Sequence, residues 1–352
     1  MNKRPPRTGE VVLKRKNTLL VDGSALFKQS FNGAKDQYNH FGCHIGGLLA
    51  FLTTLRMVLE NDLYHRVYVF WDGTFSGKLR YNIYQPYKSG RGKDYINGTQ
   101  PTDESELNQR KLLWEYLNEM YVRQIKDEVV EGDDFIAYYC LNKTPNERIT
   151  IISNDRDFLQ LLSDDIRIYF LDMKVYVTID NYLEYPKKFK FHQSNSVLMK
   201  TMVGDSSDSI KGISRLGEDT LIKYFPELKE RKVSLNEIID SAKKQQEERV
   251  NNKKKPLAVF QNIINGITDG PQKEKIYEIN ECLVNLSKPM MTKDAIESLE
   301  QLMEGTLDSS GRELKNVFTM MKRDGLNHAL GNRRYESFLE PFKKLIPREI
   351  NF

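Results

Sequence analysis

The sequence lacks long apolar runs and has few cysteines. None of the 352 residues falls in a run near the roughly 18 apolar residues of a membrane span, and residues 1–16 contain no apolar signal segment. Cys43, Cys140 and Cys282 are too few and too scattered for a disulfide framework or a four-thiolate zinc site. We therefore expect a soluble protein of a reducing compartment, the cytoplasm, with no membrane partner.

The composition provides enough apolar side chains for a sizeable core. Hydrophobic residues make up 39% of the chain and charged residues 29%, with 18 Tyr and 17 Phe. These values exclude a largely disordered chain. The length is more than twice the ~150 residues of a typical domain, which predicts two domains or one enlarged domain.

The net charge of +4 says little about partners, but the distribution of charge says more. Residues 1–16 contain six basic side chains and one Glu, and residues 223–255 contain ten basic and six acidic side chains. Acidic residues cluster in the middle of the chain. Basic flanks around acidic clusters suit a polyanionic substrate, although any single charge run also fits ordinary solvated surface.

Strand and helix patterns alternate over residues 18–180. We expect strands at 18–21, 66–71, 149–152, 166–171 and 174–179, a short extended piece at 129–130, and helices at 45–60, 103–121, 134–141 and from 158 onward. This alternation predicts an α/β domain with a mostly parallel sheet. Beyond residue 190 the pattern is helical, and residues 242–256 form either a linker or an exposed helical arm.

Acidic side chains follow the predicted strands or lie close to their ends. In an open α/β sheet, ligands bind beyond the carboxyl ends of the strands. Asp22, Asp72, Glu131 and Asp155 come directly after predicted strands. The remaining members of the set are Asp133, Asp134 and Asp157, within three residues of the same edge, and Asp205 and Asp208 in a Gly-Asp-Ser-Ser-Asp segment. We expect these carboxylates to share one cleft.

Carboxylates this close together need cations, because like charges raise one another's pKa. Oxygen ligands without His or Cys favour Mg²⁺ or Mn²⁺, and a pair of such ions supports attack on a phosphodiester. A single Asp-Gly after a strand is more often only a turn, and Asp155 with Asp157 also fits a helix cap. Five clusters at successive strand or loop ends favour the metal interpretation.

Two other motifs suggest different chemistry. Asp72-Gly73-Thr74 is similar to the nucleophile motif of aspartyl-phosphate phosphatases, but the nucleophile would have to stand at Phe70. His40, Cys43 and His44 have zinc-like spacing but no fourth ligand nearby, so an ordinary structural site is the favoured reading.

Six segments resemble the phage and bacterial 5′-nuclease (flap endonuclease) family. They are VDGSALF at 21–27, FWDG at 70–73, PYKSGR at 86–91, VEGDDFIAY at 130–138, ISNDRDFLQLL at 152–162 and LMKTMVGDSSDSIKGISRLG at 198–217. Residues 313–343 are similar to the end of the phage members called ribonuclease H. The ordered set is highly specific.

The resemblance implies a PIN-like nuclease domain at 18–190 with a helical arch at about 80–127. A basic tail at 1–17 would precede it, and a helical region at 191–352 with a helix–three-turn–helix DNA clamp would follow. The resemblance also implies two Mg²⁺ ions, replaceable by Mn²⁺. The first set of ligands is Asp22, Asp72, Glu131 and Asp133; the second is Asp155, Asp157, Asp205 and Asp208; Asp134 matches a further acidic position.

The resemblance assigns basic residues as well. Lys88 and Arg91 match the base of the arch and reach the scissile phosphate, while Lys200 matches the opposite wall. DNA contacts are expected from Arg80, from Tyr87 by stacking on a flipped or frayed base, and from the hairpin Gly212, Arg215 and Gly217. Arg215 replaces the middle glycine of the family hairpin, so a direct phosphate contact is expected there and a monovalent-cation site is not carried over.

The implied activity is 5′-3′ exonuclease and flap endonuclease action in replication, with RNase H activity on primers in RNA–DNA hybrids. Branched or 5′-ended DNA, a single-strand-binding protein or a sliding clamp are the implied partners of a monomer, in the host cytoplasm if phage-encoded. The arch segment 92–102 would be ordered only on threaded DNA. The alternatives are a catalytically silent DNA-binding protein of the same fold and a PIN-type ribonuclease, which leaves Lys200 to Gly217 unexplained.

Overall fold

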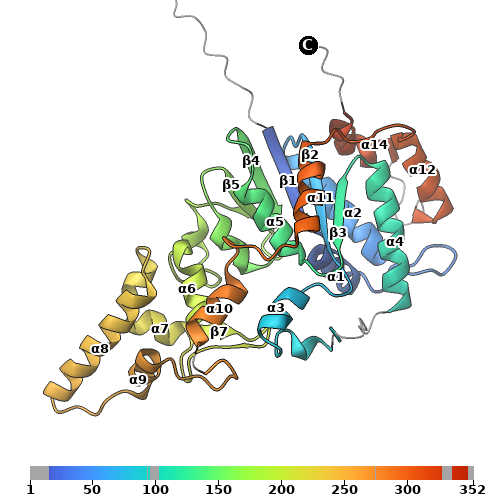
Figure 1. Ribbon diagram of the computed structural model, residues 1–352. Helices are drawn as coiled ribbons and strands as arrows, with labels where there is room; N and C mark the ends of the chain where they lie inside the picture. The colour runs from blue at the N-terminus through green and yellow to red at the C-terminus, as the bar shows by residue number, and fades with distance from the viewer. Residues whose placement is uncertain (1–15, 93, 96–102, 274, 327–334, 348–352) are drawn as a thin grey trace, which may run out of the picture.

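The computed structural model describes residues 16–92, 94–95, 103–273, 275–326 and 335–347. Its centre is a six-stranded sheet of order β3-β2-β1-β4-β5-β6, in which only β6 is antiparallel to its neighbour (Figure 1). The strands are β1 Lys16–Asp22, β2 Arg66–Asp72, β3 Arg123–Asp127, β4 Glu147–Ile152, β5 Ile166–Phe170 and β6 Val175–Val177. The predicted α/β class with a mostly parallel sheet is confirmed.

Helices cover both faces of the sheet. Leu19 and Val21 of β1 face the core beneath α1 Gly23–Gly33, α2 Gly46–Asn61 and α4 Glu104–Glu119. Leu20 points the opposite way, toward α5 Gly132–Leu141, η2 Arg156–Leu161 and α11 Lys293–Glu304. Side chains alternate across a strand, so a strand buried on both faces is apolar throughout. This explains why residues 19–21 and 67–71 form continuous apolar runs.

The segment after β6 builds an apolar core of its own. Phe225, Leu221 and Phe260 lie in an apolar cluster that is separate from the two cores of the sheet. Its elements are η3 Tyr182–Glu184, η4 Gln193–Asn195, α6 Ser196–Val203, β7 Gly204–Asp205, β8 Ile210–Lys211, α7 Glu218–Tyr224, η5 Pro226–Lys229, α8 Leu235–Asn251, α9 Ala258–Asn265 and α10 Ile276–Val284.

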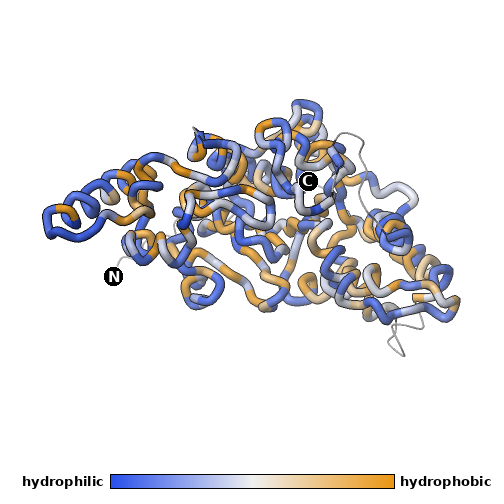
Figure 2. Tube along the Cα trace, turned by 90° about the horizontal axis from the view of Figure 1, so that it is seen from below, coloured by the Kyte–Doolittle hydropathy of each residue, from blue (hydrophilic) through white to orange (hydrophobic). Residues whose placement is uncertain are grey.

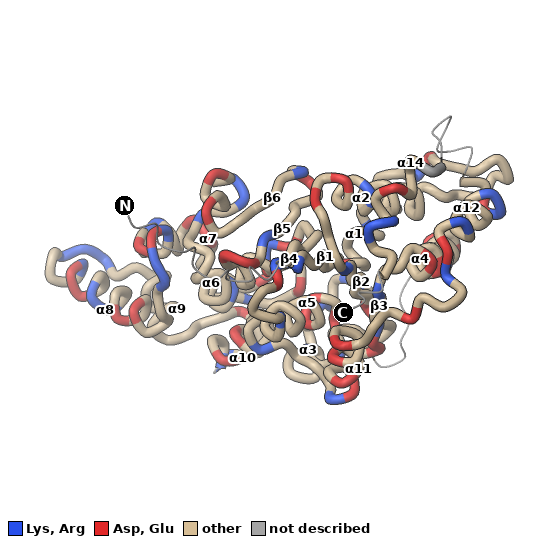
Figure 3. Tube along the Cα trace, turned by 90° about the horizontal axis from the view of Figure 1, so that it is seen from above, with Lys and Arg blue, Asp and Glu red and all other residues tan. Residues whose placement is uncertain are grey.

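Helix α8 extends from the body of the protein (Figure 1) and is largely hydrophilic (Figure 2). It begins with a capping box, in which the Ser234 hydroxyl accepts from the Glu237 amide and the Glu237 carboxylate accepts from the Ser234 amide. Of the two readings of residues 242–256, a helical arm is therefore correct up to Asn251. Basic and acidic residues are mixed along α8 (Figure 3), so it is not a uniformly basic surface.

The end of the described chain returns to the first face of the sheet. The elements there are α12 Leu314–Arg323, α14 Tyr335–Leu339 and η6 Glu340–Leu345. Val317, Met321 and Phe342 join the core of α2 and α4. The Tyr116 hydroxyl on α4 donates to Asp324 Oδ2 at 2.9 Å. The last described segment thus stabilises the helices that cover β1 and β2.

The prediction of an extended piece at 129–130 is wrong. The strand lies earlier, at Arg123–Asp127, and Val129 and Val130 form a turn in which both amides donate to Asp127 Oδ1 at 2.8 and 2.9 Å. Helix α1 was not predicted, and the segment from Arg156 is a 3₁₀ helix that starts before Phe158. An Asx turn satisfies backbone donors locally, which two valines in sequence do not reveal.

Several predictions rest on residues outside the described part. The basic tail at 1–17 falls almost entirely on residues 1–15, and residues 93 and 96–102 of the arch are likewise outside. The domain boundaries remain predictions. None of the helices in the described ranges combines the length and apolar content needed to cross a membrane.

Gly212 provides a test of packing at the β7–β8 hairpin. A Cβ at Gly212 would lie 2.1 Å from the carbonyl carbon and oxygen of Val203, whereas a Cβ at Gly217 would meet nothing within 4 Å. We expect Gly212→Ala to lower the free energy of unfolding by roughly 1–3 kcal/mol because backbone must shift. Gly217→Ala is the matched control and should change it by less than about 1 kcal/mol in urea titrations. Equal effects would contradict this packing role.

Candidate active site

The order of the strands lines up four of the predicted carboxylates along one edge of the sheet. In the order β3-β2-β1-β4, Glu131 follows β3, Asp72 ends β2, Asp22 ends β1 and Asp155 follows β4. The first four strands of that order are parallel, so their carboxyl ends meet at the same edge. Residues separated by up to 133 positions in the chain therefore follow or end neighbouring strands.

Asp22 is fixed by two hydrogen bonds at the junction of β1 and α1. Its Oδ1 accepts from the Ala25 amide at 3.0 Å as the N-cap of α1, and its Oδ2 accepts from the Ser153 hydroxyl at 3.0 Å. Ser153 is fully buried, and its oxygen accepts from the Asp155 amide at 3.1 Å. Ser153 thus links Asp22 to Asp155. Sequence reasoning missed it, although it directly follows β4.

Asp72 is held by backbone and hydroxyl groups. Its Oδ1 accepts from the Gly132 amide at 2.9 Å, at the start of α5, and its own amide donates to the Ser24 hydroxyl at 2.9 Å. Gly132 immediately precedes Asp133. The first helical turns of α1 and α5 therefore orient the strand-end carboxylates.

Arg80 was expected to contact DNA, and the structure corrects this. It is 5% exposed, and its guanidinium donates to Glu131 at 2.7 Å, to both oxygens of Asp134 at 2.5 and 2.9 Å, and to the Leu283 carbonyl at 2.8 Å. Asp134 is fully buried and also accepts from the Met290 amide. Asp134 is thus the counter-ion of Arg80 rather than an accessible metal ligand, because burial of a guanidinium requires paired carboxylates.

Tyr87 was expected to stack on a base, and this expectation is also corrected. Its ring is 3% exposed, and its hydroxyl contacts Glu131 at 2.9 Å and Asp208 at 3.2 Å. Lys88 is ion-paired with Glu131, and its amide donates to the Asp208 carbonyl at 2.8 Å. Tyr87 and Lys88 thereby join the first and second predicted ligand sets.

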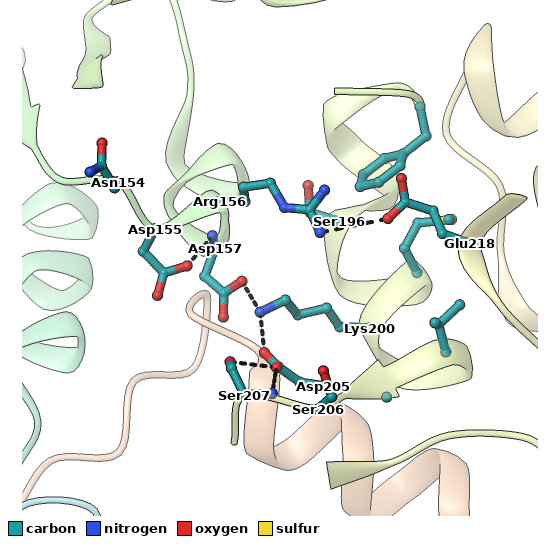
Figure 4. Close-up of a pocket in the computed structure, with 14 residues that line it drawn as sticks. Asn154, Asp155, Arg156, Asp157, Ser196, Lys200, Asp205, Ser206, Ser207 and Glu218 are labelled. Atoms are coloured by element: carbon teal, nitrogen blue, oxygen red, sulfur yellow. Dashed lines mark hydrogen bonds and ion pairs between the residues drawn. The ribbon is translucent and has the colours of Figure 1, made fainter. Parts of the chain in front are cut away.

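Three members of the second set, Asp155, Asp157 and Asp205, line a pocket of about 550 Å³ together with Lys200 (Figure 4). Lys200 Nζ lies between Asp157, with which it is ion-paired, and Asp205 Oδ2 at 2.5 Å. The Ser207 hydroxyl donates to Asp205 Oδ1 at 2.6 Å. Asp208, in the turn between β7 and β8, pairs with half-exposed Arg91, whose Nη2 lies 2.6 Å from Asp208 Oδ1. The structure therefore places the three predicted basic residues on carboxylates.

Charge is compensated unevenly across the site. Burial alone would raise the pKa of Glu131, but Lys88 and Arg80 lower it to about 2. Asp22 has no such partner, and burial together with the charge of Asp72 raises its pKa to about 7. Burial and the charge of Asp22 likewise hold the pKa of Asp133 well above its usual range. Asp157 behaves in the same way, because burial and the charge of Asp155 outweigh Lys200 and raise its pKa to about 7. Repulsion therefore remains poorly compensated at Asp22, Asp133 and Asp157.

The donor set fits divalent ions chemically. All its members are carboxylates, and cations relieve repulsion of the kind seen at Asp22 and Asp133. Within the ranges that the structure describes, no three His, Cys, Asp or Glu side chains are arranged to hold a metal ion by themselves. Lys88 and Lys200 contact several of the oxygens instead. The two predicted ligand sets remain predictions.

In the hairpin after β8, Arg215 stands where the family has a glycine, and it keeps the backbone conformation typical of glycine. Arg215 is exposed and has φ +65°, in the left-handed region that glycine adopts most readily. Gly212 is packed against Val203, and Gly217 caps the seven-residue helix α7. Gly212 is thus explained by packing within the protein, while DNA contacts of Arg215 and Gly217 remain predictions.

The sequence of this chain is similar to those of known 5′-3′ exonucleases. Residues 17–189 match the family model for the 5′-3′ exonuclease N-terminal resolvase-like domain. A 5′-3′ exonuclease of Bacillus subtilis is 27% identical over 316 residues, which cover 87% of this chain and 96% of that protein. DNA polymerase I of B. subtilis is 26% identical over 73% of this chain, but the match spans only 28% of that relative's length.

Solved structures share the fold. The flap endonuclease of bacteriophage T5, in a complex with DNA and metal ions, has a TM-score of 0.53 at 18% identity, covering 87% of this chain and all of that chain. The T5 protein co-crystallised with metal ions has a TM-score of 0.52 at 17% identity, covering 94% of this chain. The catalytic core of Rad2 with DNA has a TM-score of 0.51 at 15% identity, covering 96% of this chain and 95% of that chain.

The buried Arg80 network generates a stability prediction. Arg80→Met would leave the buried Asp134 carboxylate without its cation, so we expect a loss of about 3–5 kcal/mol in the free energy of unfolding. Arg91→Met breaks a half-exposed pair with Asp208 and should cost less than about 1 kcal/mol. Urea unfolding of both variants in EDTA measures the difference. Similar losses would show that Arg80 does not have this role.

The repulsion at Asp22 generates the opposite prediction. Asp22→Asn keeps an acceptor for the Ala25 amide and removes a poorly compensated charge, so the variant should be more stable than wild type by roughly 0.5–2 kcal/mol in EDTA. Asp219→Asn, at a residue whose side chain is 83% exposed, is the control and should change stability by less than about 0.5 kcal/mol. Thermal unfolding checks both; a destabilised Asp22→Asn would refute the electrostatic interpretation.

Proposed function

The chain belongs to the 5′-3′ exonuclease and flap endonuclease family, and from this premise we propose that it hydrolyses phosphodiester bonds near the 5′ ends of DNA. The cleaved strand would carry a 5′ phosphate on one product and a 3′ hydroxyl on the other. Single-strand/duplex junctions, including 5′ flaps, are the proposed sites of attack.

One observation carries this proposal: carboxylates from the ends of four neighbouring strands lie along one edge, with Lys88 and Lys200 among them. Acidic side chains alone would repel a phosphodiester. When ammonium groups stand among them, the carboxylates can bind cations while the ammonium groups bind phosphate oxygens. This supports hydrolysis of a polyanion over binding alone, since a DNA-binding surface needs no buried acidic residues such as Asp22 and Glu131.

We assign two Mg²⁺ ions, or Mn²⁺ in their place, to this edge. Their proposed ligands are Asp22, Asp72, Glu131 and Asp133 for one ion and Asp155, Asp157, Asp205 and Asp208 for the other. When bound, such ions lower the pKa of a water molecule and stabilise negative charge on phosphate oxygens. With cations on the carboxylates, Lys88, Arg91 and Lys200 become available to donate hydrogen bonds to the scissile phosphate, which orients it.

RNA primers in RNA–DNA hybrids are proposed as further substrates, because residues 313–343 resemble the phage members called ribonuclease H. A role in replication follows, with a single-strand-binding protein or a sliding clamp as proposed partner. The hairpin at Arg215 is the proposed contact with duplex phosphates, since Arg215 is exposed and follows β8, the strand that pairs with β7 and its predicted metal ligand Asp205.

The direct test uses a labelled 5′-flap duplex, a nicked duplex and an RNA–DNA hybrid in Mg²⁺. We expect wild type to cleave the flap substrate near the junction and to lose this activity in EDTA. Asp155→Ala combined with Asp157→Ala should abolish cleavage while flap binding in a gel-shift assay stays within about threefold, because these residues are assigned to metal rather than to DNA. Wild type that cleaves none of the three substrates would refute the proposal.

Lys88→Ala separates catalysis from binding. Because Lys88 is assigned to the scissile phosphate, we expect turnover to fall by about 10²-fold or more with a much smaller change in affinity. Single-turnover cleavage and equilibrium binding of the same flap substrate measure the two quantities. An unchanged turnover would contradict the assigned role of Lys88.

A further inference from the structure

Arg110 on α4 is not used by the proposed chemistry, yet it lies beside the strand-end carboxylates. Its guanidinium lies 5.5 Å from the ring centre of Phe27 and 5.6 Å from that of Trp71. Its Nη2 donates to the Ser24 hydroxyl at 3.3 Å, and the same hydroxyl accepts from the amide of Asp72. Arg110 is therefore one hydroxyl away from the backbone of a predicted metal ligand.

The charge of Arg110 is not used in an ion pair among the described residues. Glu106, one helical turn earlier on α4, would be its ordinary partner. The Glu106 carboxylate instead pairs with Lys28 of α1 at 2.8 Å. Lys28 thus joins α1 to α4, while Arg110 is turned toward Ser24 and the edge of the sheet. A half-buried guanidinium with five donors and one long hydrogen bond can still bind an anion.

The two aromatic rings hold the planar guanidinium of Arg110 in position for an anion. They restrict the guanidinium by cation–π contacts, so less side-chain entropy is lost when its remaining donors bind. A guanidinium fork matches two oxygens of a phosphate, and a phosphodiester is the anion that the proposed function brings to this edge. A carboxylate ligand is not favoured. The neighbouring acids would repel a carboxylate as they repel a phosphate, but only a backbone phosphate is also held in place by the strand whose scissile bond lies in the site.

We propose that Arg110 binds a backbone phosphate of the cleaved strand, on the 5′ side of the scissile bond. The side follows from the arrangement of the site. Lys200 contacts Asp157, which follows β4, and Asp205 of β7, and the hairpin of β7 and β8 leads to Arg215, the proposed duplex contact. Arg110 on α4 lies instead at the ends of β1 and β2, beside Ser24 of α1. If the duplex lies on the Arg215 side, the strand that continues from the scissile bond toward its 5′ end would leave on the Arg110 side. This inference rests on the proposed function.

Arg110 is thus a positioning residue for the 5′ strand. It would favour substrates that have a further phosphate on the 5′ side of the scissile bond. Flap DNA has this phosphate, whereas a flap-free duplex with a 5′ hydroxyl, cleaved after its first nucleotide, lacks it. The residue therefore gives the site a preference between two substrates that share the same duplex.

The experiment compares Arg110→Gln with Lys111→Gln, an exposed lysine one position further along the same helix. Binding of a 5′-flap duplex is measured in EDTA. We expect Arg110→Gln to weaken binding about 10-fold and to reduce the salt dependence by about one phosphate contact. Lys111→Gln should change binding less than about 2-fold. On the flap-free duplex with a 5′ hydroxyl, Arg110→Gln should bind like wild type.

A second arm requires no stable variant. A single neutral methylphosphonate replaces the first phosphate 5′ of the scissile bond, and we expect wild type to lose about 10-fold in binding. The same substitution should cause no further loss with Arg110→Gln, because both changes remove one contact. Arg110→Lys, which keeps the charge but not the planar fork, should recover part of the binding.

Two results would overturn the inference. One is an equal loss for Arg110→Gln on flap and flap-free duplexes, which indicates a purely structural role. The other is an additive loss when variant and methylphosphonate are combined, or no loss from the methylphosphonate with wild type. Cleavage of the flap substrate by wild type in Mg²⁺ is scored separately. If wild type cleaves but Arg110 makes no difference, only this inference fails, and if wild type neither binds nor cleaves, both fail.

Discussion

Repulsion among carboxylates at one edge of the sheet is the constraint on which the rest of this structure depends. Parallel pairing of neighbouring strands forces Asp22 and Asp72 together, because the last residues of β1 and β2 lie at the same edge. Burial strengthens the repulsion, since fewer water molecules screen it. The fold offsets part of this cost with two cations, buried Arg80 and partly buried Lys88, both paired with Glu131 and neither with Asp22. That imbalance is what makes the edge suited to divalent ions.

Arg80 and Lys88 also connect two parts of the chain. Arg80 reaches the carbonyl of Leu283 at the end of α10, and the amide of Lys88 reaches the carbonyl of Asp208 in the β7–β8 hairpin. Tyr84 adds a contact to Ser209 at 3.4 Å and lies in a small apolar cluster with residues of α10. The segment 78–91 therefore fixes the helical region to the sheet. A shift of that segment would move both predicted ligand sets together.

The site is also strained in its backbone. Three of its non-glycine residues have left-handed φ: Lys88 at +52°, Ser209 at +60° and Arg215 at +65°. Each such residue costs about 1–3 kcal/mol, and the surrounding contacts must over-determine it. At Lys88, which pairs with Glu131, this strain adds to the charge repulsion at the edge of the sheet.

Sequence alone determined the alternation that predicts an α/β sheet and the acidic residues at its strand ends, because both depend on local pattern: apolar runs form buried strands, and strands end at turns. Sequence reasoning failed where the local pattern is ambiguous. It predicted an extended piece at 129–130, because two adjacent valines are typical of a strand, whereas the strand ends at Asp127 and the valines lie in an Asx turn. Only the tertiary structure decided which charges meet. Arg80 and Tyr87 look like exposed DNA contacts in the sequence, but they are buried counterparts of Glu131, and Arg110 prefers Ser24 to the acid one turn away. Such choices depend on strand order and on distances between residues that are far apart in the chain, and no local pattern encodes them.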